Sequence, residues 1–126
     1  MSIPQVSDSE LELMKIIWSR GGKALYAEIM ESLAESGKSW QKNTVITLLS
    51  RLADKGLLKT RKIGRRNEYE ALVTEADYQE AQARTLVNKL YEGEARGLVA
   101  TLIERKMLTA EDCAELRRYW EGTGEA

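Results

Sequence analysis

The sequence predicts a mainly helical chain with one short β-hairpin near its middle. Apolar residues recur at spacings of three and four in most segments, which is the pattern of helices that bury one face. The exception is a pair of strand-like segments around Gly64, which predicts a hairpin. With 126 residues, of which 43% are hydrophobic and 31% charged, the chain has the composition of a soluble globular protein of one or two small domains.

The first two helices are marked by their ends. Residues 7–10, Ser-Asp-Ser-Glu, form a capping-box pattern that begins a helix, and Gly21 and Gly22 end it. A second helix is predicted over residues 26–34, although Leu25, at its cap position, has no side chain that could cap it. The apolar faces of these helices consist of Leu11, Met14, Ile17, Trp18, Ile29, Met30 and Leu33.

A third helix is predicted to end at Gly56 and to begin after Ser39 or Gln41. Its core face consists of Val45, Leu48, Leu49 and Leu52. The opposite face has no carboxylate before Asp54 and offers amides, hydroxyls and cations, which suit a phosphate backbone and base edges. This face consists of Lys42, Asn43, Thr44, Ile46, Thr47, Ser50 and Arg51.

The hairpin is predicted from strands over residues 57–63 and 67–73, joined by a Gly-Arg-Arg turn at residues 64–66. The side chains expected to face the helices are Leu58, Tyr69 and Leu72. Three helices followed by a hairpin with a cationic tip form the pattern of a winged helix-turn-helix, which is a DNA-binding domain.

Charge is divided unevenly along the chain, although its net value is only −1. Residues 38–66 hold nine Lys or Arg against one Asp, a net charge of +8, whereas residues 75–126 hold seven cations against eleven acids, a net charge of −4. The basic middle favours nucleic acid as a partner. Two alternatives remain open: a basic face that docks an acidic protein, and a regulator gated by a small ligand.

Several functional classes are disfavoured by composition. Histidine is absent and Cys113 is the single cysteine, so we expect no transition-metal site, no intrachain disulfide and no imidazole-assisted nucleophile. The sequence contains no Gly-rich phosphate loop and no apolar run long enough to span a bilayer. We therefore expect no enzymatic activity, no cofactor and no membrane insertion, and a reducing cytoplasm as the location.

Residues 74–126 are predicted to form three further helices, the first and last of which begin at Thr-x-x-Asp caps on Thr74 and Thr109. Three short helices make a thin core, so we expect a second copy of the chain to cover their apolar side chains. The expected dimer interface consists of Leu86, Leu90, Leu98, Val99, Leu102, Ile103, Leu116 and Trp120.

These patterns divide the chain into a DNA-binding winged-helix domain, residues 1–73, and a helical dimerisation domain, residues 74–126. The predicted partner is double-stranded DNA with two half-sites, because a symmetric dimer presents two copies of the reading helix. The expected DNA contacts are Lys42, Asn43, Thr44, Ile46, Thr47, Arg51, Lys62, Arg65 and Arg66.

Motifs in both halves also resemble those of a known protein family. Residues 44–49, Thr-Val-Ile-Thr-Leu-Leu, with Trp40 before them and Lys-Gly-Leu-Leu after them, resemble the core signature of the penicillinase repressor family, the BlaI/MecI/CopY group. Residues 10–18 resemble its first helix, and residues 88–93 its C-terminal half. The resemblance implies a cytoplasmic repressor that binds, as a homodimer, a palindromic operator with TACA and TGTA half-sites and controls β-lactam resistance or copper export genes.

The chain departs from the family pattern at three places. Copper-responsive members carry C-terminal cysteines, which residues 120–126 lack, so copper sensing is not expected. Antibiotic-responsive members are cut between an Asn and a Phe, and the aligned bond here joins Thr101 to Leu102. The resemblance thus implies relief of repression by cutting at this bond, through a membrane sensor-protease pathway. Ile46 stands where β-lactam repressors commonly have Arg, which leaves the preferred base there open.

Overall fold

The computed structural model describes residues 3–122, which fall into two compact units divided after residue 82, inside one helix. The mainly helical fold is confirmed. In the first unit the elements are α1 (Asp8–Ser19), β1 (Lys23–Leu25), α2 (Tyr26–Glu35), α3 (Lys42–Asp54), β2 (Leu58–Ile63) and β3 (Arg66–Ala71). They are followed by α4 (Glu75–Leu90), α5 (Ala95–Glu104) and α6 (Ala110–Gly122).

The beginnings of α1 and α2 follow from local side-chain bonds. At α1 the predicted capping box is confirmed: the Ser7 amide donates to Glu10 Oε1 at 2.8 Å, and the Glu10 amide donates to Ser7 Oγ at 3.2 Å. At α2 the cap residue is Leu25, which has no side-chain acceptor. Its amide donates to Glu28 Oε1 at 2.8 Å instead, so half of a capping box begins this helix.

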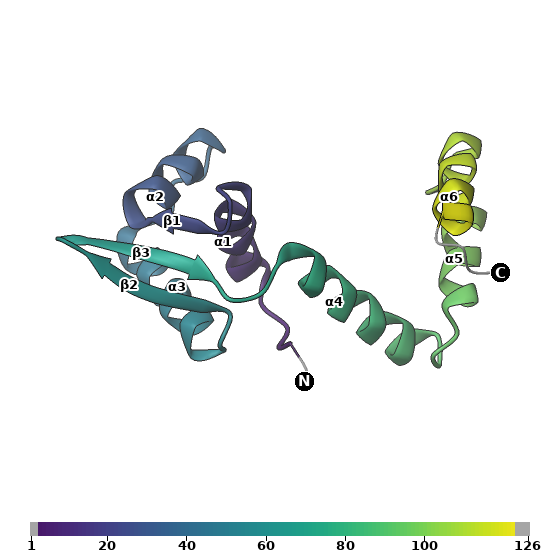
Figure 1. The fold of residues 1–126 in the computed structure, drawn as a ribbon, viewed down its shortest axis with the longest axis horizontal. Helices are drawn as coiled ribbons and strands as arrows, with labels where there is room; N and C mark the ends of the chain where they lie inside the picture. The colour runs from purple at the N-terminus through teal and green to yellow at the C-terminus, as the bar shows by residue number, and fades with distance from the viewer. Residues whose placement is uncertain (1–2, 123–126) are drawn as a thin grey trace. The chain divides into compact units, whose positions relative to one another are not determined.

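The strands form one antiparallel sheet in the order β1-β3-β2. The predicted hairpin of β2 and β3 is present, and Figure 1 shows its tip projecting past α2 and α3. Strand β1 was not predicted from the sequence, because three residues are too few to show an alternating pattern. Tyr69 of the central strand β3 pairs with Ala24 of β1 on one side and with Thr60 of β2 on the other, so it lies in the middle of the sheet.

In the first unit α1, α2 and α3 lie around the sheet (Figure 1), and buried side chains from all of them form one continuous core. The predicted apolar stripe of α3 is fully part of it, and so are Leu58 and Tyr69. The expectation that Leu72 also faces the helices is wrong, because this side chain is 53% exposed. Tyr69 and Leu72 are three residues apart, and alternation along an extended chain directs them to opposite faces. Ala71 and Val73 pack against the core instead.

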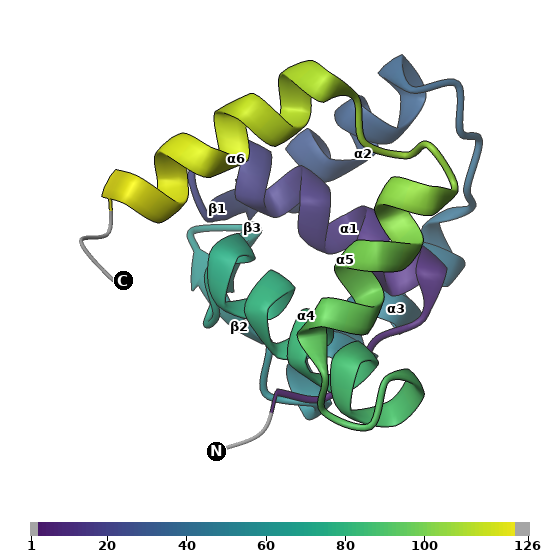
Figure 2. The ribbon, with the colours of Figure 1, turned by 90° about the vertical axis from the view of Figure 1, so that its right-hand side faces the viewer.

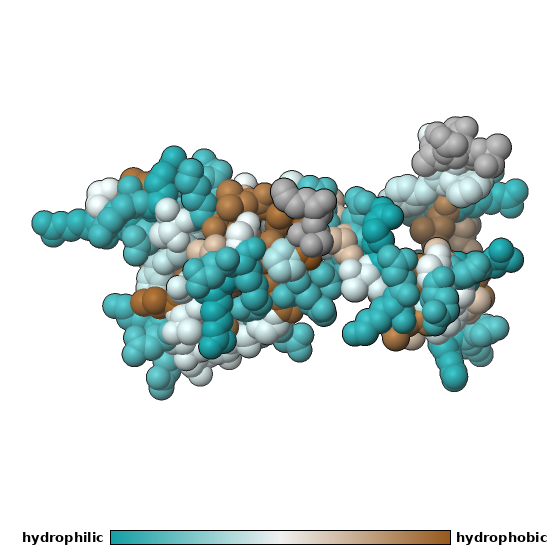
Figure 3. Space-filling view, turned by 90° about the horizontal axis from the view of Figure 1, so that it is seen from below, coloured by the Kyte–Doolittle hydropathy of each residue, from teal (hydrophilic) through white to brown (hydrophobic). Residues whose placement is uncertain are grey.

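The second unit contains the end of α4 together with α5 and α6, which run in different directions after the turn at Lys106 (Figure 2). The Tyr91 hydroxyl donates to Thr101 Oγ1 at 3.1 Å, and the Tyr91 ring lies over Gly97. None of the described residues from 83 to 122 is buried. Figure 3 shows apolar side chains on the surface of this unit.

Candidate nucleic-acid interface

Helix α3 has one buried face and one exposed face, as predicted. Val45, Leu49 and Leu52 are almost completely buried, whereas all the residues expected to contact DNA are exposed. The helix begins at Lys42 after the N-cap Gln41, whose side chain makes no capping bond. Its first turn also contains no acidic residue. The positive end of the helix dipole is therefore not offset by a carboxylate of its own, which suits an approaching phosphate.

The wing is the hairpin of β2 and β3. Its turn contains Gly64, whose φ of +63° is a left-handed conformation that glycine adopts readily. Arg65 lies in the turn, but Arg66, predicted as a turn residue, is the first residue of β3 and pairs with Ile63. Lys62, Arg65 and Arg66 are all exposed. The predicted wing cations therefore lie together at the tip.

The ion pairs distinguish two groups among the nine cations of residues 38–66. Three of them have acidic partners: Lys38 with Glu12 at 3.9 Å, Lys55 with Glu10 at 2.7 Å, and Arg61 with Glu68 at 3.0 Å. The other six make no ion pair with any residue that the structure describes. They are Lys42, Arg51, Lys59, Lys62, Arg65 and Arg66. All five cations predicted to contact DNA belong to this unpaired group, and Lys59 adds a sixth that was not predicted.

Glu10 shows why Lys55 differs from its neighbours. Its carboxylate is buried, which by itself opposes ionisation, but the hydrogen bonds from Lys55 and the Ser7 amide outweigh this effect and hold the pKa of Glu10 below its ordinary value. Glu10 is therefore ionised at neutral pH and fixes the Lys55 ammonium. The sequence predicted Glu10 only as a capping residue, since nothing in the spacing links it to a lysine 45 residues later.

A groove of about 640 Å³ lies between the N-terminal ends of α2 and α3 and strand β3. Its lining includes Tyr26, Lys42, Ile46, Arg65 and Tyr69. Burial raises the pKa of the Tyr69 hydroxyl, and the neighbouring Tyr26 hydroxyl raises it further. Two phenols and several unpaired cations thus line one hollow.

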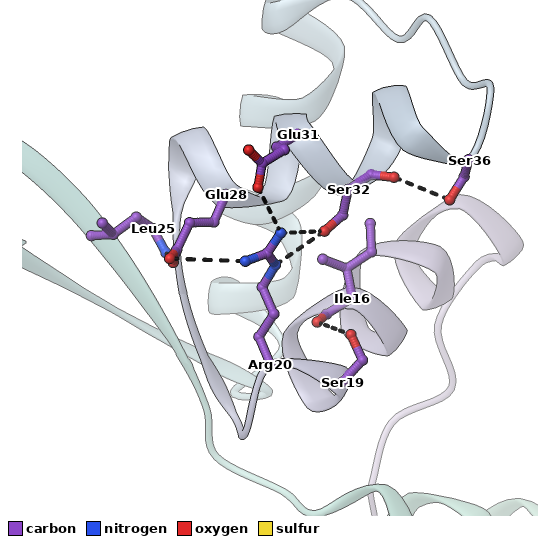
Figure 4. A network of polar contacts seen from close by, with 8 residues as sticks. All are labelled: Ile16, Ser19, Arg20, Leu25, Glu28, Glu31, Ser32 and Ser36. Atoms are coloured by element: carbon purple, nitrogen blue, oxygen red, sulfur yellow. Dashed lines mark hydrogen bonds and ion pairs between the residues drawn. The ribbon is translucent and has the colours of Figure 1, made fainter.

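The sequence did not predict this groove. The beginning of α2 lies beside β3 because β1, which directly precedes α2, pairs with β3, and β1 was not predicted. A polar network links α2 to the end of α1 (Figure 4). The Arg20 guanidinium, at the end of α1, donates to Ser32 Oγ at 2.9 and 3.0 Å and to Glu31 at 3.2 Å. It also lies 3.8 Å from Glu28, whose other bond caps α2. Arg20 therefore fixes the end of α2 that lines the groove.

The residues predicted for dimerisation lie in the second unit and at its edge. Leu86, Leu90, Val99, Ile103, Leu116 and Trp120 are exposed in the single chain, whereas Leu98 and Leu102 are half-buried. The Thr101–Leu102 bond lies inside α5, where the Thr101 hydroxyl donates to the Gly97 carbonyl at 3.1 Å. Dimer contact and cleavage at these positions stay predictions.

The described part of the chain contains no group of three or more His, Cys, Asp or Glu side chains that could hold a metal ion. Within residues 3–122, no helix has both the length and the apolar character needed to cross a membrane.

The first unit is a winged helix-turn-helix domain: three helices, a three-stranded sheet with β1, and a hairpin that carries unpaired cations beside the exposed face of α3. The chain belongs to the penicillinase repressor family, whose sequence model matches residues 6–122. The resemblance inferred from the motifs is thus confirmed.

Relatives and solved structures agree with this assignment. The chain is 34% identical over 119 residues to a penicillinase repressor of Bacillus licheniformis, covering 94% of this chain and 91% of that protein. It is 32% identical to the methicillin resistance regulatory protein MecI of Staphylococcus aureus (strain N315), covering 90% of each.

Two solved structures resemble part of the chain. The DNA-binding domain of the repressor BlaI superposes with a TM-score of 0.53 at 39% identity, covering 62% of this chain and 94% of that one. The monomeric form of Bacillus licheniformis BlaI in complex with the blaP half-operator gives a TM-score of 0.51 at 39% identity, covering 61% and 92%.

Proposed function

We propose that this protein is a transcriptional repressor that binds a palindromic operator as a homodimer and blocks a promoter by occupying it. The observation that carries the proposal is the coincidence of six unpaired cations with the exposed face of α3 and the wing, in a domain 39% identical to BlaI in its half-operator complex. The relatives' names support control of β-lactamase or methicillin-resistance genes.

The proposed division of labour places α3 in the major groove. Thr44 and Thr47 are three residues apart on its exposed face and can donate to or accept from base edges or phosphates. Ile46 is 41% exposed and offers an apolar contact for a thymine methyl group. Arg51, one turn beyond Thr47, is a candidate phosphate contact, and Asn43 a further base contact.

The wing cations and the groove beside them are proposed to hold the DNA backbone. Lys62, Arg65 and Arg66 would neutralise phosphates and release their counterions. Lys42 and the Tyr69 hydroxyl, which line the groove, are proposed to contact the DNA strand that passes between α3 and the wing. Lys59 is the additional cation on β2.

Dimerisation is assigned to the second half of the chain. We propose residues 1–73 as the DNA-binding domain and residues 74–126 as the dimerisation domain, with the beginning of α4 packed against the former through Tyr78. Exposed Leu90, Ile103 and Trp120 would be covered by the second copy. A protein with these parts acts by binding, without a cofactor and without enzymatic activity, in the cytoplasm.

Relief of repression is proposed to follow cleavage of the Thr101–Leu102 bond in a pathway that begins at a membrane sensor-protease. Because this bond lies within α5, a protease needs the helix to open locally before it can bind an extended chain. The Tyr91 hydroxyl bond to Thr101 opposes that opening.

The test is selection from a pool of random duplexes by the purified full chain. We expect enrichment of a palindrome whose half-sites are about one helical turn apart, or a multiple of it. We expect the selected operator to compete with scrambled duplex and its affinity to fall steeply with salt. No enrichment, or equal affinity for selected and scrambled duplex, would contradict the proposal and favour docking of an acidic protein on the basic face.

A further inference from the structure

A short N-terminal arm, residues 5–7, connects the end of α3 with the beginning of α4 inside the first unit. On one side, the Gln5 carbonyl accepts a hydrogen bond from Lys55 Nζ at 3.4 Å. On the other side, the Val6 amide donates to the Tyr78 hydroxyl at 3.1 Å. Adjacent residues of one extended segment therefore contact both helices.

The α3 side of the arm is held by a buried carboxylate. Glu10 is 2% exposed and bonds both Lys55 Nζ, at 2.7 Å, and the Ser7 amide, at 2.8 Å. Lys55 is the C-cap residue of α3, and its own amide bonds the Arg51 carbonyl at 3.0 Å. The position of the arm and the end of the DNA-reading helix are therefore fixed by the same carboxylate.

The α4 side is held by aromatic residues. Tyr78 is 6% exposed and lies in the first turn of α4, with its ring centroid 5.8 Å from that of Trp18. Trp18 Nε1 donates to the Val73 carbonyl at 2.9 Å, just before α4 begins. Helix α4 continues beyond residue 82 into the second unit, so its first turns carry the link to that half of the chain.

We propose that the arm is a coupling element and that Glu10 and Tyr78 are positioning residues for DNA binding. The proposal rests on the proposed DNA-binding function of α3. A shift of α4 moves Tyr78, the Tyr78 bond moves the arm, and the arm carries Lys55 and the end of α3 with it. By thermodynamic reciprocity, DNA bound by α3 stabilises the beginning of α4 to the same degree.

Two conservative variants weaken the two sides of the arm separately. Tyr78→Phe keeps the ring but deletes the acceptor of the Val6 amide, and Glu10→Gln keeps the shape but deletes the charge that holds Lys55. Each is expected to lower affinity for the selected operator about 2- to 10-fold, the size of one net hydrogen bond. Because both act through the arm, the double variant should lose less than the product of the two losses. Tyr119→Phe, at an exposed position of α6, is the matched control.

Hydrogen exchange of the backbone amides separates coupling from simple destabilisation. In the free full chain, Tyr78→Phe should speed exchange at the end of α3, near Lys55, while the control does not. With operator added, the wild type should show slower exchange in both α3 and the first turns of α4. In Tyr78→Phe the slowing should persist in α3 and be lost in α4.

Three results would overturn the coupling. The first is an unchanged exchange rate near Lys55 in Tyr78→Phe without DNA, and the second is an equal slowing of exchange in α4 when operator is added to the wild type and to Tyr78→Phe. The third is a double variant whose loss of affinity equals the product of the two single losses. A wild type that binds no operator refutes the proposed function instead, and the exchange of the free protein still decides on the arm.

Discussion

The two halves of this chain differ in how many of their apolar side chains are buried. All buried apolar residues among the described ones lie between Leu13 and Tyr78, whereas residues 83–122 bury none. In the second half Leu90, Met107 and Trp120 are more than 60% exposed. The first half buries its apolar side chains in its own core and carries charged residues on its surface. The second half leaves its apolar surface for a partner, which in this account is the second copy.

Charge also differs between the two halves. Residues 38–66 carry six unpaired cations on α3 and the wing, whereas residues 83–122 hold seven cations and seven acids, a net charge of zero. The second half has no excess of cations to attract phosphate, so the two surfaces are suited to different partners. The comparison therefore predicts that changes in one half affect folding and DNA contact, and changes in the other affect assembly.

The largest expected effect comes from breaking assembly. Val99 and Ile103 lie one turn apart on α5 and are exposed in the single chain. Changing both to Asp would place carboxylates in the proposed interface, so we expect monomers and a loss of operator affinity of about 100-fold or more, since bivalent binding is lost. Sedimentation measures the oligomeric state and titration measures the operator affinity. Glu104→Lys is the control for a change of charge on the same helix. A double variant that remains dimeric would place the interface elsewhere.

A core substitution should distinguish the two halves by stability. Leu49 is 1% exposed, so Leu49→Ala is expected to lower the free energy of unfolding by about 2–5 kcal/mol. Leu116 is 48% exposed, so Leu116→Ala in the monomeric background should change it by less than about 1 kcal/mol. Denaturant unfolding gives both values. Similar losses at the two positions would show that α6 has a core of its own.

Sequence discrimination should reside in α3. We expect Thr47→Ala to weaken binding to the selected operator by about 1–3 kcal/mol more than binding to scrambled duplex, because a base contact is lost. Arg51→Ala should weaken both equally. Competition titration at fixed salt measures the difference. Equal losses for Thr47→Ala would assign base recognition to Asn43, Ile46 or the shape of the DNA.

The wing should contribute affinity without discrimination. Arg65→Ala with Arg66→Ala removes two unpaired cations, so the slope of log affinity against log salt is expected to become shallower by about two units. Arg61→Ala, whose guanidinium is already paired with Glu68 at 3.0 Å, should change it less and is the matched control. If the slope of the double variant equals that of the wild type, the wing does not contact the backbone.

Local signals determined what could be predicted from sequence. The capping box at Ser7, the stripe of α3 and the hairpin around Gly64 each depend on a few neighbouring residues, and the structure contains all three. What depends on tertiary proximity was missed: strand β1, the groove at Tyr69 and the Glu10–Lys55 pair. The error at Leu72 has a different origin, since alternation from Tyr69 along the extended chain already directs Leu72 to the opposite face.

The unpaired cations could be counted from sequence but not separated from the paired ones. Lys55 and Lys62 both lie in the basic middle of the sequence, yet Lys55 is neutralised by a residue of α1, whereas Lys62 makes no ion pair with any described residue. Only the fold brings the acids to Lys38, Lys55 and Arg61. The division of the nine cations into a paired and an unpaired group is therefore a result of the structure.

The most direct test of the account is the mass of the full chain in solution. Sedimentation equilibrium at micromolar concentration should give twice the chain mass of 14.3 kDa without DNA, and two chains on each selected palindrome. A mass of one chain under these conditions, with its apolar helices still folded, would contradict the claim that the second half exists to bring two DNA-binding domains together.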